Sequence, residues 1–190
     1  MKRNYTFIPL FLLLLVAVVA CSNNSKSTTA DSEGKKPETV VNVPQFDADS
    51  AYHYVKAQVD FGPRVPNTEA HKACGEYLAK KLEQFGAKVY NQKVDLITYD
   101  GTMLKARNII GAYKPKAKKR IALFSHWDSR PWADADPDAK NRYTPILGAN
   151  DGASGVGVLL EIARQIQQQQ PELGIDIIFV DAEDYGPHQD

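Results

Sequence analysis

The fold of this chain is decided by three stretches: IALFSHWD at residues 121–128, GANDGASGVGVLLEIARQIQQQQ at 148–170 and IDIIFVDAED at 175–184. The first and last contain short continuous apolar runs, at residues 121–124 and 175–180, which are typical of strands with both faces covered. The middle stretch has apolar residues at helical spacing. The order strand, helix, strand predicts a βαβ unit and hence two parallel strands.

Two further helices and a hairpin are expected upstream of this unit. The first helix begins after Phe46 with Asp47 or Asp49 as its cap. Its expected buried face comprises Ala51, Tyr52, Val55 and Val59. The second helix is capped by Asn67 or Thr68 and ends at Gly86. Its expected buried stripe comprises Ala70, Ala73, Cys74, Tyr77, Leu78, Leu82 and Phe85.

A hairpin-type turn at residues 99–102 separates two strand patterns, at residues 88–97 and 103–112, and predicts an antiparallel pair. Together with the βαβ unit, this pair predicts an α/β fold. We expect a mixed, largely parallel central sheet flanked by helices.

Composition excludes several classes of protein. The chain has 190 residues, of which 43% are hydrophobic, with 23 basic and 23 acidic residues. These values indicate an ordinary globular domain without the excess of basic residues that is typical of nucleic-acid-binding proteins. Two cysteines, Cys21 and Cys74, are too few for a disulfide scaffold or a zinc site built from thiolates. A metal here must be held by His, Asp and Glu.

The N-terminus has the pattern of an export signal. Residues 1–3 (MKR) are positively charged, and an apolar run that is too short to span a bilayer follows up to residue 20. The run ends in VVAC at residues 18–21, which resembles a bacterial lipobox with Cys21 as the lipidated residue. A plain secretory signal with cleavage elsewhere is the alternative.

These features divide the chain into three parts. Residues 1–20 are expected to be a lipoprotein signal peptide, residues 21–45 a lipidated flexible tether and residues 46–190 the folded domain. The tether is expected because residues 22–38 contain no large apolar side chain. The location expected from this division is the cell envelope, as a membrane-anchored periplasmic or outer-membrane lipoprotein.

Potential metal ligands follow the two strands of the βαβ unit and precede its helix. They are His126, Asp128, Asp151, Asp181, Glu183 and Asp184. Ligands of open α/β sheets bind beyond the carboxyl ends of parallel strands, so we expect these side chains to share one edge of the sheet. Carboxylates with an imidazole suit Zn²⁺. Taken singly, Asp151 could be a helix cap, His126 a core histidine and the acid pair 183–184 a solvated turn.

Three neighbouring residues have more than one interpretation. Asp128 could orient the imidazole of His126 as an outer acceptor. Trp127 and Trp132, in the long loop after residue 126, could wall a substrate pocket or pack the loop down. Cys74 lies on the predicted apolar stripe and is expected to be an inert buried thiol.

Four motifs, in order, resemble the zinc-dependent M28 peptidase-like family and, within it, the bacterial glutaminyl cyclases. They are residues 61–67 (FGPRVPN), 126–134 (HWDSRPWAD), 148–156 (GANDGASGV) and 179–186 (FVDAEDYG). The resemblance runs from about Phe61 to the last residue. It implies Asp151 and Asp184 as zinc ligands and Glu183 as the general base. His126 corresponds to the ligand of the second metal in two-zinc aminopeptidases of the family.

The implied activity is that of a glutaminyl-peptide cyclotransferase, an acyltransferase. It converts the N-terminal glutamine of peptides or proteins to pyroglutamate and releases ammonia, and one Zn²⁺ is expected. The alternative is a zinc aminopeptidase with two metals, but such enzymes of this family usually follow the acid pair with a Gly-rich segment, whereas residues 185–188 are YGPH. A third possibility is a non-catalytic lipoprotein remnant of the fold.

The family domain is longer than this chain and supplies its last metal ligand, a histidine, well downstream of the acid pair. Residues 46–190 are therefore expected to be the N-terminal part of an M28-like catalytic domain, truncated at its C-terminus. We expect this form alone to bind zinc weakly and to be inactive.

Overall fold

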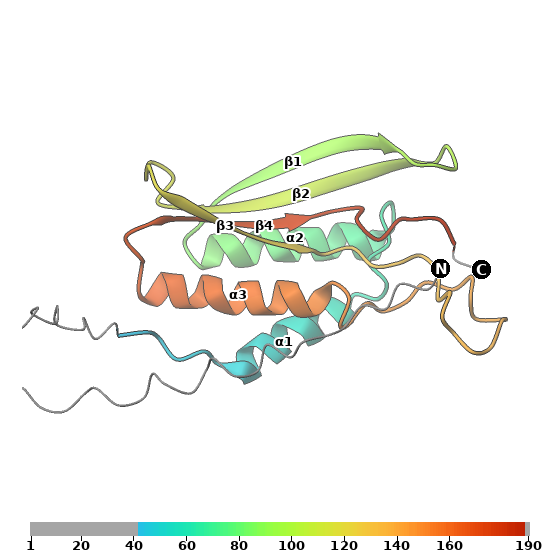
Figure 1. Cartoon of the computed structure of the whole chain (residues 1–190), viewed down its shortest axis with the longest axis horizontal. Helices are drawn as coiled ribbons and strands as arrows, with labels where there is room; N and C mark the ends of the chain where they lie inside the picture. Colours follow the sequence, from blue (N-terminus) through green and yellow to red (C-terminus); the bar gives the residue numbers. More distant parts are fainter. Residues whose placement is uncertain (1–41, 189–190) are drawn as a thin grey trace, which may run out of the picture. The chain divides into compact units, whose positions relative to one another are not determined.

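The computed structural model describes residues 42–188, so the predicted signal peptide, Cys21 and most of the predicted tether lie outside the described residues. The described chain contains, in order, α1 (Ala48–Val59), α2 (Glu69–Gln84), β1 (Lys88–Ile97), β2 (Met103–Tyr113), β3 (Arg120–His126), α3 (Ala153–Gln168) and β4 (Gly174–Val180) (Figure 1). Within this part of the chain, no helix is both long and apolar enough to cross a membrane.

The four described strands form one mixed sheet in the order β1-β2-β4-β3. The predicted βαβ unit is confirmed, because β3 and β4 pair in parallel and α3 connects them. The predicted hairpin is also confirmed, since β1 and β2 are antiparallel. The pairing of β2 with β4 is antiparallel as well. Among the described strands only one of the three pairings is parallel, so "largely parallel" does not hold for this part of the sheet.

The hydrophobic core lies between one face of the sheet and helices α2 and α3. Ile109, Ile177 and Phe179 on the strands are fully buried there. They belong to the same apolar cluster as Leu78 of α2 and Leu160 of α3. Figure 1 shows all three helices on one side of the sheet, with α1 packed beyond α3. The described helices therefore cover one face only.

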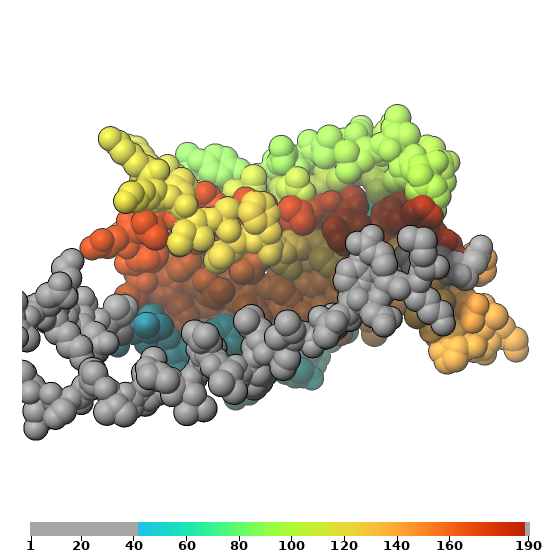
Figure 2. All heavy atoms as spheres, in the orientation of Figure 1, coloured from blue at the N-terminus to red at the C-terminus, as the bar shows by residue number. Residues whose placement is uncertain are grey.

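The opposite face of the sheet carries an apolar row that the sequence did not predict to be open. Tyr90, Ile110, Ile178 and Phe124 are in register across the four strands. Tyr90 is 44% exposed and Phe124 is 62% exposed. The prediction that both faces of residues 121–124 are covered is wrong for the described residues, because β3 is an edge strand with helices on one side. In Figure 2 the yellow atoms, which belong to β3 and the turn before it, lie at the surface.

The structure decides between the alternative helix caps. The carboxylate of Asp47 accepts a hydrogen bond from Ser50 N (3.0 Å) and caps α1. The hydroxyl of Thr68 accepts one from His71 N (3.2 Å) and caps α2. Both are the usual N-cap arrangement.

Two residues of the predicted apolar faces are exposed. Tyr52 of α1 is 70% exposed, and Ala73 of α2 is also exposed. Polar side chains are buried in these helices instead: Gln58 donates to Ala153 O (3.1 Å), and His71 bonds to Asp181. Hydrophobic periodicity missed both because the buried side chains are polar, and each has a hydrogen-bond partner in a distant segment of the chain.

Candidate metal centre

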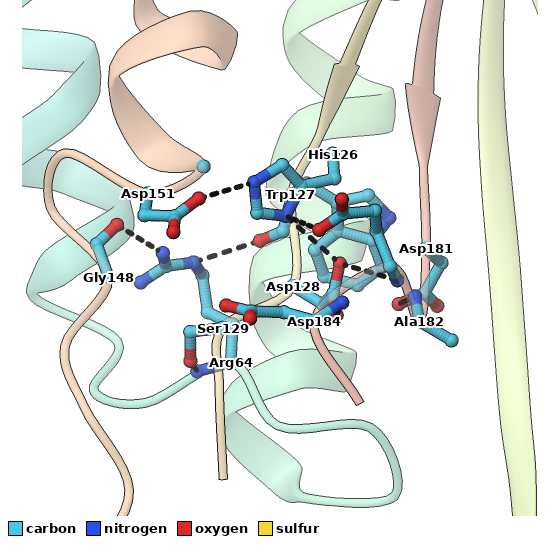
Figure 3. A network of polar contacts seen from close by, with 12 residues as sticks. Arg64, His126, Trp127, Asp128, Ser129, Gly148, Asp151, Asp181, Ala182 and Asp184 are labelled. Atoms are coloured by element: carbon cyan, nitrogen blue, oxygen red, sulfur yellow. Dashed lines mark hydrogen bonds and ion pairs between the residues drawn. The ribbon is translucent and has the colours of Figure 1, made fainter. Parts of the chain in front are cut away.

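Three chain segments meet where the parallel strands end, as the sequence predicted. His126 is the last residue of β3, Asp151 lies just before α3, and Asp184 follows β4. One potential ligand atom from each of the three lies within 4.8 Å of the others. Figure 3 shows their side chains converging from separate ribbons. The structure thus brings together the three residues for which the sequence predicted a metal-binding role.

Asp151 faces His126 and does not cap the helix. Its Oδ1 lies 2.8 Å from His126 Nε2. The residue at the N-cap of α3 is Gly152, and it makes no side-chain cap bond. A Cβ on Gly152 would lie 2.6 Å from His126 Nε2, so this approach requires glycine. The peptide bond between Asp151 and Gly152 is cis. The alternative interpretation of Asp151 as a cap is therefore wrong.

Asp128, which contacts both His126 and the loop of the acid pair, is fully buried. Its Oδ1 is 3.4 Å from His126 Nδ1, and its Oδ2 accepts a hydrogen bond from Asp184 N at 3.0 Å. The amide of Glu183 lies 3.4 Å from its Oδ1. One carboxylate thus contacts the imidazole and the loop that carries the acid pair, which are the contacts expected of a residue that orients a histidine ligand.

The carboxylate of Asp184 lies near the Arg130 guanidinium and is influenced by the charges of Asp151 and Asp128. Its carbonyl oxygen accepts a hydrogen bond from Arg130 Nη1 (3.2 Å), and its Oδ1 lies 3.8 Å from the same nitrogen. Burial, together with the negative charges of Asp151 and Asp128, raises the pKa of the Asp184 carboxyl to about 6. Its Oδ2 is buried and has no hydrogen-bond partner within residues 42–188.

The electrostatics of His126 match its position among acids. The hydrogen bond to Asp128, with further contributions from Asp151 and Glu183, raises the pKa of His126 to about 9 despite its partial burial. The carboxylates of three chain segments thus surround the imidazole, and their negative charge favours its protonated form.

Glu183 lies at the rim of this cluster. Its side chain is 62% exposed, and its Oε2 is 3.7 Å from His126 Nδ1. A carboxylate that is open to solvent and adjacent to the ligand cluster can reach a group bound there. Its predicted role as a base remains a prediction.

Asp181, predicted to join the edge cluster, bonds elsewhere. Its carboxylate bonds to His71 Nε2 (2.9 Å) and accepts a hydrogen bond from Arg107 N (2.7 Å). These partners belong to α2 and β2, so Asp181 secures the end of β4 against them. Its side chain is fully buried.

The two tryptophans differ in their surroundings. Trp127 is fully buried, stacks on His71 at 4.2 Å between ring centroids and donates to Arg107 O (3.1 Å). It also lines a groove of about 590 Å³ whose lining residues include none of the three candidate ligands. The structure therefore favours packing for Trp127. The ring centroid of Trp132 lies 5.7 Å from that of Tyr185, which follows the acid pair. The role of Trp132 in a substrate pocket remains a prediction.

Sequence reasoning missed two arginines that organise the site. Arg64 is fully buried and donates to the backbone carbonyls of Trp127 and Gly148. Arg130 donates to the carboxylate of Asp134 as well as to the carbonyl of Asp184. Both lie in motifs that carried the family resemblance, residues 61–67 and 126–134. The motifs were the available signal, but they did not specify the bonding partners.

The donor set fits a zinc ion. An imidazole nitrogen and two carboxylates are ligands that Zn²⁺ accepts, and three protein ligands leave a position open. A second sign is that the Oδ2 of Asp184 has no hydrogen-bond partner among the described residues, because buried carboxylate oxygens are normally hydrogen-bonded. His126, Asp151 and Asp184 could therefore hold a metal ion, and by the resemblance His126 corresponds to the ligand of a second metal.

Comparison with known proteins agrees with this chemistry. Residues 108–188 match the family model Peptidase family M28. A glutaminyl cyclase of Bacteroides thetaiotaomicron, solved with N-acetylhistamine bound, is 80% identical and superposes with a TM-score of 0.77 over 78% of this chain and 51% of its own. A Zn-dependent exopeptidase of Parabacteroides distasonis is 65% identical, with the same TM-score and coverage. The glutaminyl-peptide cyclotransferase of Drosophila melanogaster is 28% identical over 64% of this chain and 33% of its own.

The fold and the site define a zinc exopeptidase-like α/β protein. The matches confirm the resemblance predicted from the sequence, which is to the M28 peptidase family and, within it, to the bacterial glutaminyl cyclases. It spans about half the length of the solved structures it matches.

Proposed function

We propose that the protein is a zinc-dependent glutaminyl-peptide cyclotransferase that acts on peptides or proteins with an N-terminal glutamine. The observation that carries the proposal is the convergence of His126, Asp151 and Asp184 within 4.8 Å, with Glu183 beside them. Its relationship at 80% identity to a glutaminyl cyclase supports the substrate class.

The reaction joins two groups of one residue, the α-amine and the γ-amide carbon of glutamine. A bound zinc ion supplies Lewis acidity toward the γ-carbonyl. Because nucleophile and electrophile belong to the same residue, the chain's main task is to hold the side chain folded back and to limit access of water.

In the proposed reaction Glu183 moves the proton. It would take a proton from the α-amine during attack and deliver it to the amide nitrogen that leaves as ammonia. Its exposed carboxylate, 3.7 Å from His126 Nδ1, can meet a substrate from solvent. Asp128 has a different task, because it is buried and bonds to the backbone of the same loop.

A zinc aminopeptidase is the second candidate. The relative described as a Zn-dependent exopeptidase, at 65% identity, is the observation that favours it. In that reaction Glu183 would activate a water for cleavage of the first peptide bond. The same residues would take part, and that reaction would use two metal ions instead of one.

One assay separates the two activities. The whole protein is incubated with zinc and a glutamine-initiated dipeptide amide, and ammonia and peptide mass are followed. Loss of ammonia with the peptide bond intact supports the cyclase, whereas release of free glutamine would establish the aminopeptidase. A Glu183→Gln variant with unchanged activity would contradict the assignment of the base.

We also propose that the protein is anchored in the cell envelope by a lipid on Cys21. The support is the sequence alone: a basic start, an apolar run and VVAC at residues 18–21. Metabolic labelling with a palmitate analogue tests this. Label on the wild type and none on Cys21→Ser is the expected result, and label retained in the variant would contradict the anchor.

A further inference from the structure

We propose that Arg64 is a positioning residue that fixes the spacing between His126 and Asp151. It acts through two loops: the β3 loop, residues 127–129, which follows His126, and the α3 loop, residues 147–152, which contains Asp151. The inference rests on the proposed function only for the identity of the metal.

The guanidinium joins the two loops directly. Arg64 Nε donates to Trp127 O (3.0 Å) in the β3 loop. Its Nη1 donates to Leu147 O and its Nη2 to Gly148 O in the α3 loop, both at 2.8 Å. Figure 3 shows the guanidinium between these loops. Each of its three nitrogens therefore fixes one backbone carbonyl.

The backbone of Arg64 is tied to the β3 loop as well. Its amide donates to Ser129 Oγ (2.8 Å), and Ser129 N donates to its carbonyl (3.2 Å). Because both the main chain and the side chain of Arg64 contact this loop, the guanidinium has little freedom to move relative to Trp127. A shift of the α3 loop would break its remaining two bonds.

The α3 loop is shaped around this contact. Gly148 has a φ of +56°, a conformation that glycine adopts readily. A Cβ there would lie 2.9 Å from Arg64 Nη2 and 2.8 Å from Ser129 Cβ. The arginine thus packs directly on the glycine backbone three residues before Asp151, on a loop held again by the bond from Ala153 N to Gly148 O (3.2 Å).

The bonding pattern identifies what the residue does. A buried guanidinium usually neutralises a carboxylate, but the hydrogen-bond partners of this side chain are backbone carbonyls. The planar guanidinium group directs three nitrogens at three fixed carbonyl oxygens, and the ammonium group of a lysine cannot reproduce that geometry. Arg64 therefore sets backbone positions, and through them the distance between the candidate ligands.

Arg120, which is 24% exposed whereas Arg64 is fully buried, provides a control at the other end of β3. It donates to the Asp176 carboxylate (2.8 Å) and to the carbonyls of Tyr113 (3.2 Å) and Lys114 (2.6 Å). Its loss removes a similar number of hydrogen bonds from the amino end of the strand, away from His126. A general loss of stability would therefore appear in both arginine variants, whereas a positioning effect would appear only for Arg64.

The experiment uses the 190-residue chain and the variants Arg64→Lys, Arg64→Gln and Arg120→Gln. Zinc affinity is measured by competition with a chromophoric chelator, and hydrogen exchange of the two loops by mass spectrometry on the metal-free protein. We expect both Arg64 variants to bind zinc about 10–100-fold more weakly, the usual effect of losing a residue that orients a metal ligand. Exchange should rise in both loops, and Arg120→Gln should change neither quantity.

Zinc affinity and loop exchange unchanged in the Arg64 variants, or changed equally by Arg120→Gln, would overturn the proposal. If the wild type binds no zinc, the metal assignment of the proposed function fails. The exchange measurement then decides the positioning role by itself: faster exchange in both loops for Arg64→Gln alone supports it, and any other pattern refutes it.

Discussion

The carboxylate of Asp128 illustrates how a single residue assembles this site. It is buried, it lies beside the His126 ring, and it bonds to the amide of Asp184. The ends of both parallel strands therefore depend on one side chain. The acids around it differ in exposure: Asp184 is mostly buried, whereas the side chain of Asp151 is 65% exposed.

Removal of a candidate ligand should weaken zinc binding. Loss of an outer residue of a metal site typically costs 10–100-fold in affinity, so Asp151→Asn and Asp184→Asn should each cost about 100-fold or more. Asp138→Asn, in an exposed loop, is the matched control and should bind as the wild type does. Titration calorimetry checks this. Wild-type affinity in both site variants would exclude them as ligands.

Cys74 should be inert in the folded protein. Its side chain has no exposed surface, and burial raises the pKa of the thiol to about 12. In a Cys21→Ser background, we expect almost no reaction with a thiol reagent at pH 8 and full reaction in denaturant. Fast labelling of the native protein would show that the thiol is accessible.

The same shift predicts a loss of stability in alkali. The folded pKa of Cys74 lies above its ordinary value of 9.0, so ionisation favours the unfolded chain. The contribution is complete below about pH 9 and falls as the pH rises toward the folded value. In the Cys74→Ala variant, the urea midpoint should fall less between pH 9 and 10.5 than it does in the wild type. Identical pH profiles of the two proteins would contradict this.

Among the helices, a hydrogen bond to Glu161 of α3 holds the N-terminus of α1 against α3. This carboxylate is fully buried, and it accepts hydrogen bonds from Asp47 N (3.0 Å) and from Arg164 (2.7 and 2.8 Å). Because Asp47 is also the cap of α1, one contact positions the start of the helix on its neighbour.

Glu161→Gln should therefore destabilise the fold. The change leaves the partly buried Arg164 side chain without its carboxylate partner, which we expect to cost about 1–3 kcal/mol. Glu172→Gln, on an exposed residue between α3 and β4, should stay within about 0.5 kcal/mol of the wild type. Urea unfolding followed by circular dichroism compares the two. Equal midpoints would show that Glu161 does not hold the helices together.

At the scale of the whole molecule, the described chain forms a sheet with helices on one face and an apolar row on the other. The row comprises Tyr90, Ile110, Ile178 and Phe124, in register on four strands. Isolated exposed apolar residues are common, whereas a contiguous row is not. The chain also spans about half of the solved structures it matches.

The 190-residue chain should accordingly bind a hydrophobic dye in its native state. We expect fluorescence of anilinonaphthalene sulfonate to rise with the folded protein and to fall when Phe124, which is 62% exposed, is replaced by Lys. Tyr52→Lys is the control, because Tyr52 is 70% exposed on α1, away from the row. Equal dye binding by the two variants would show that the row is not the binding surface.

Much of the fold was predictable from local patterns. The βαβ unit, the hairpin and the extents of α2 and β1 follow from apolar periodicity and turn residues, which act within a few neighbours. The edge position of β3 did not follow. A continuous apolar run indicates burial on average, but whether a second layer covers Phe124 depends on chain that is distant in sequence.

The candidate site residues could be predicted from the sequence, because His126, Asp151, Glu183 and Asp184 flank regular elements and their residue types suit zinc. Which of the acids meet could not be predicted in this way and follows from the tertiary structure. Asp181 turns to His71 while Asp184 turns to the cluster, although the two are three residues apart. The reason is that side-chain direction in a loop is set by partners from other segments, such as the carbonyls that Arg64 holds, and no local pattern encodes them.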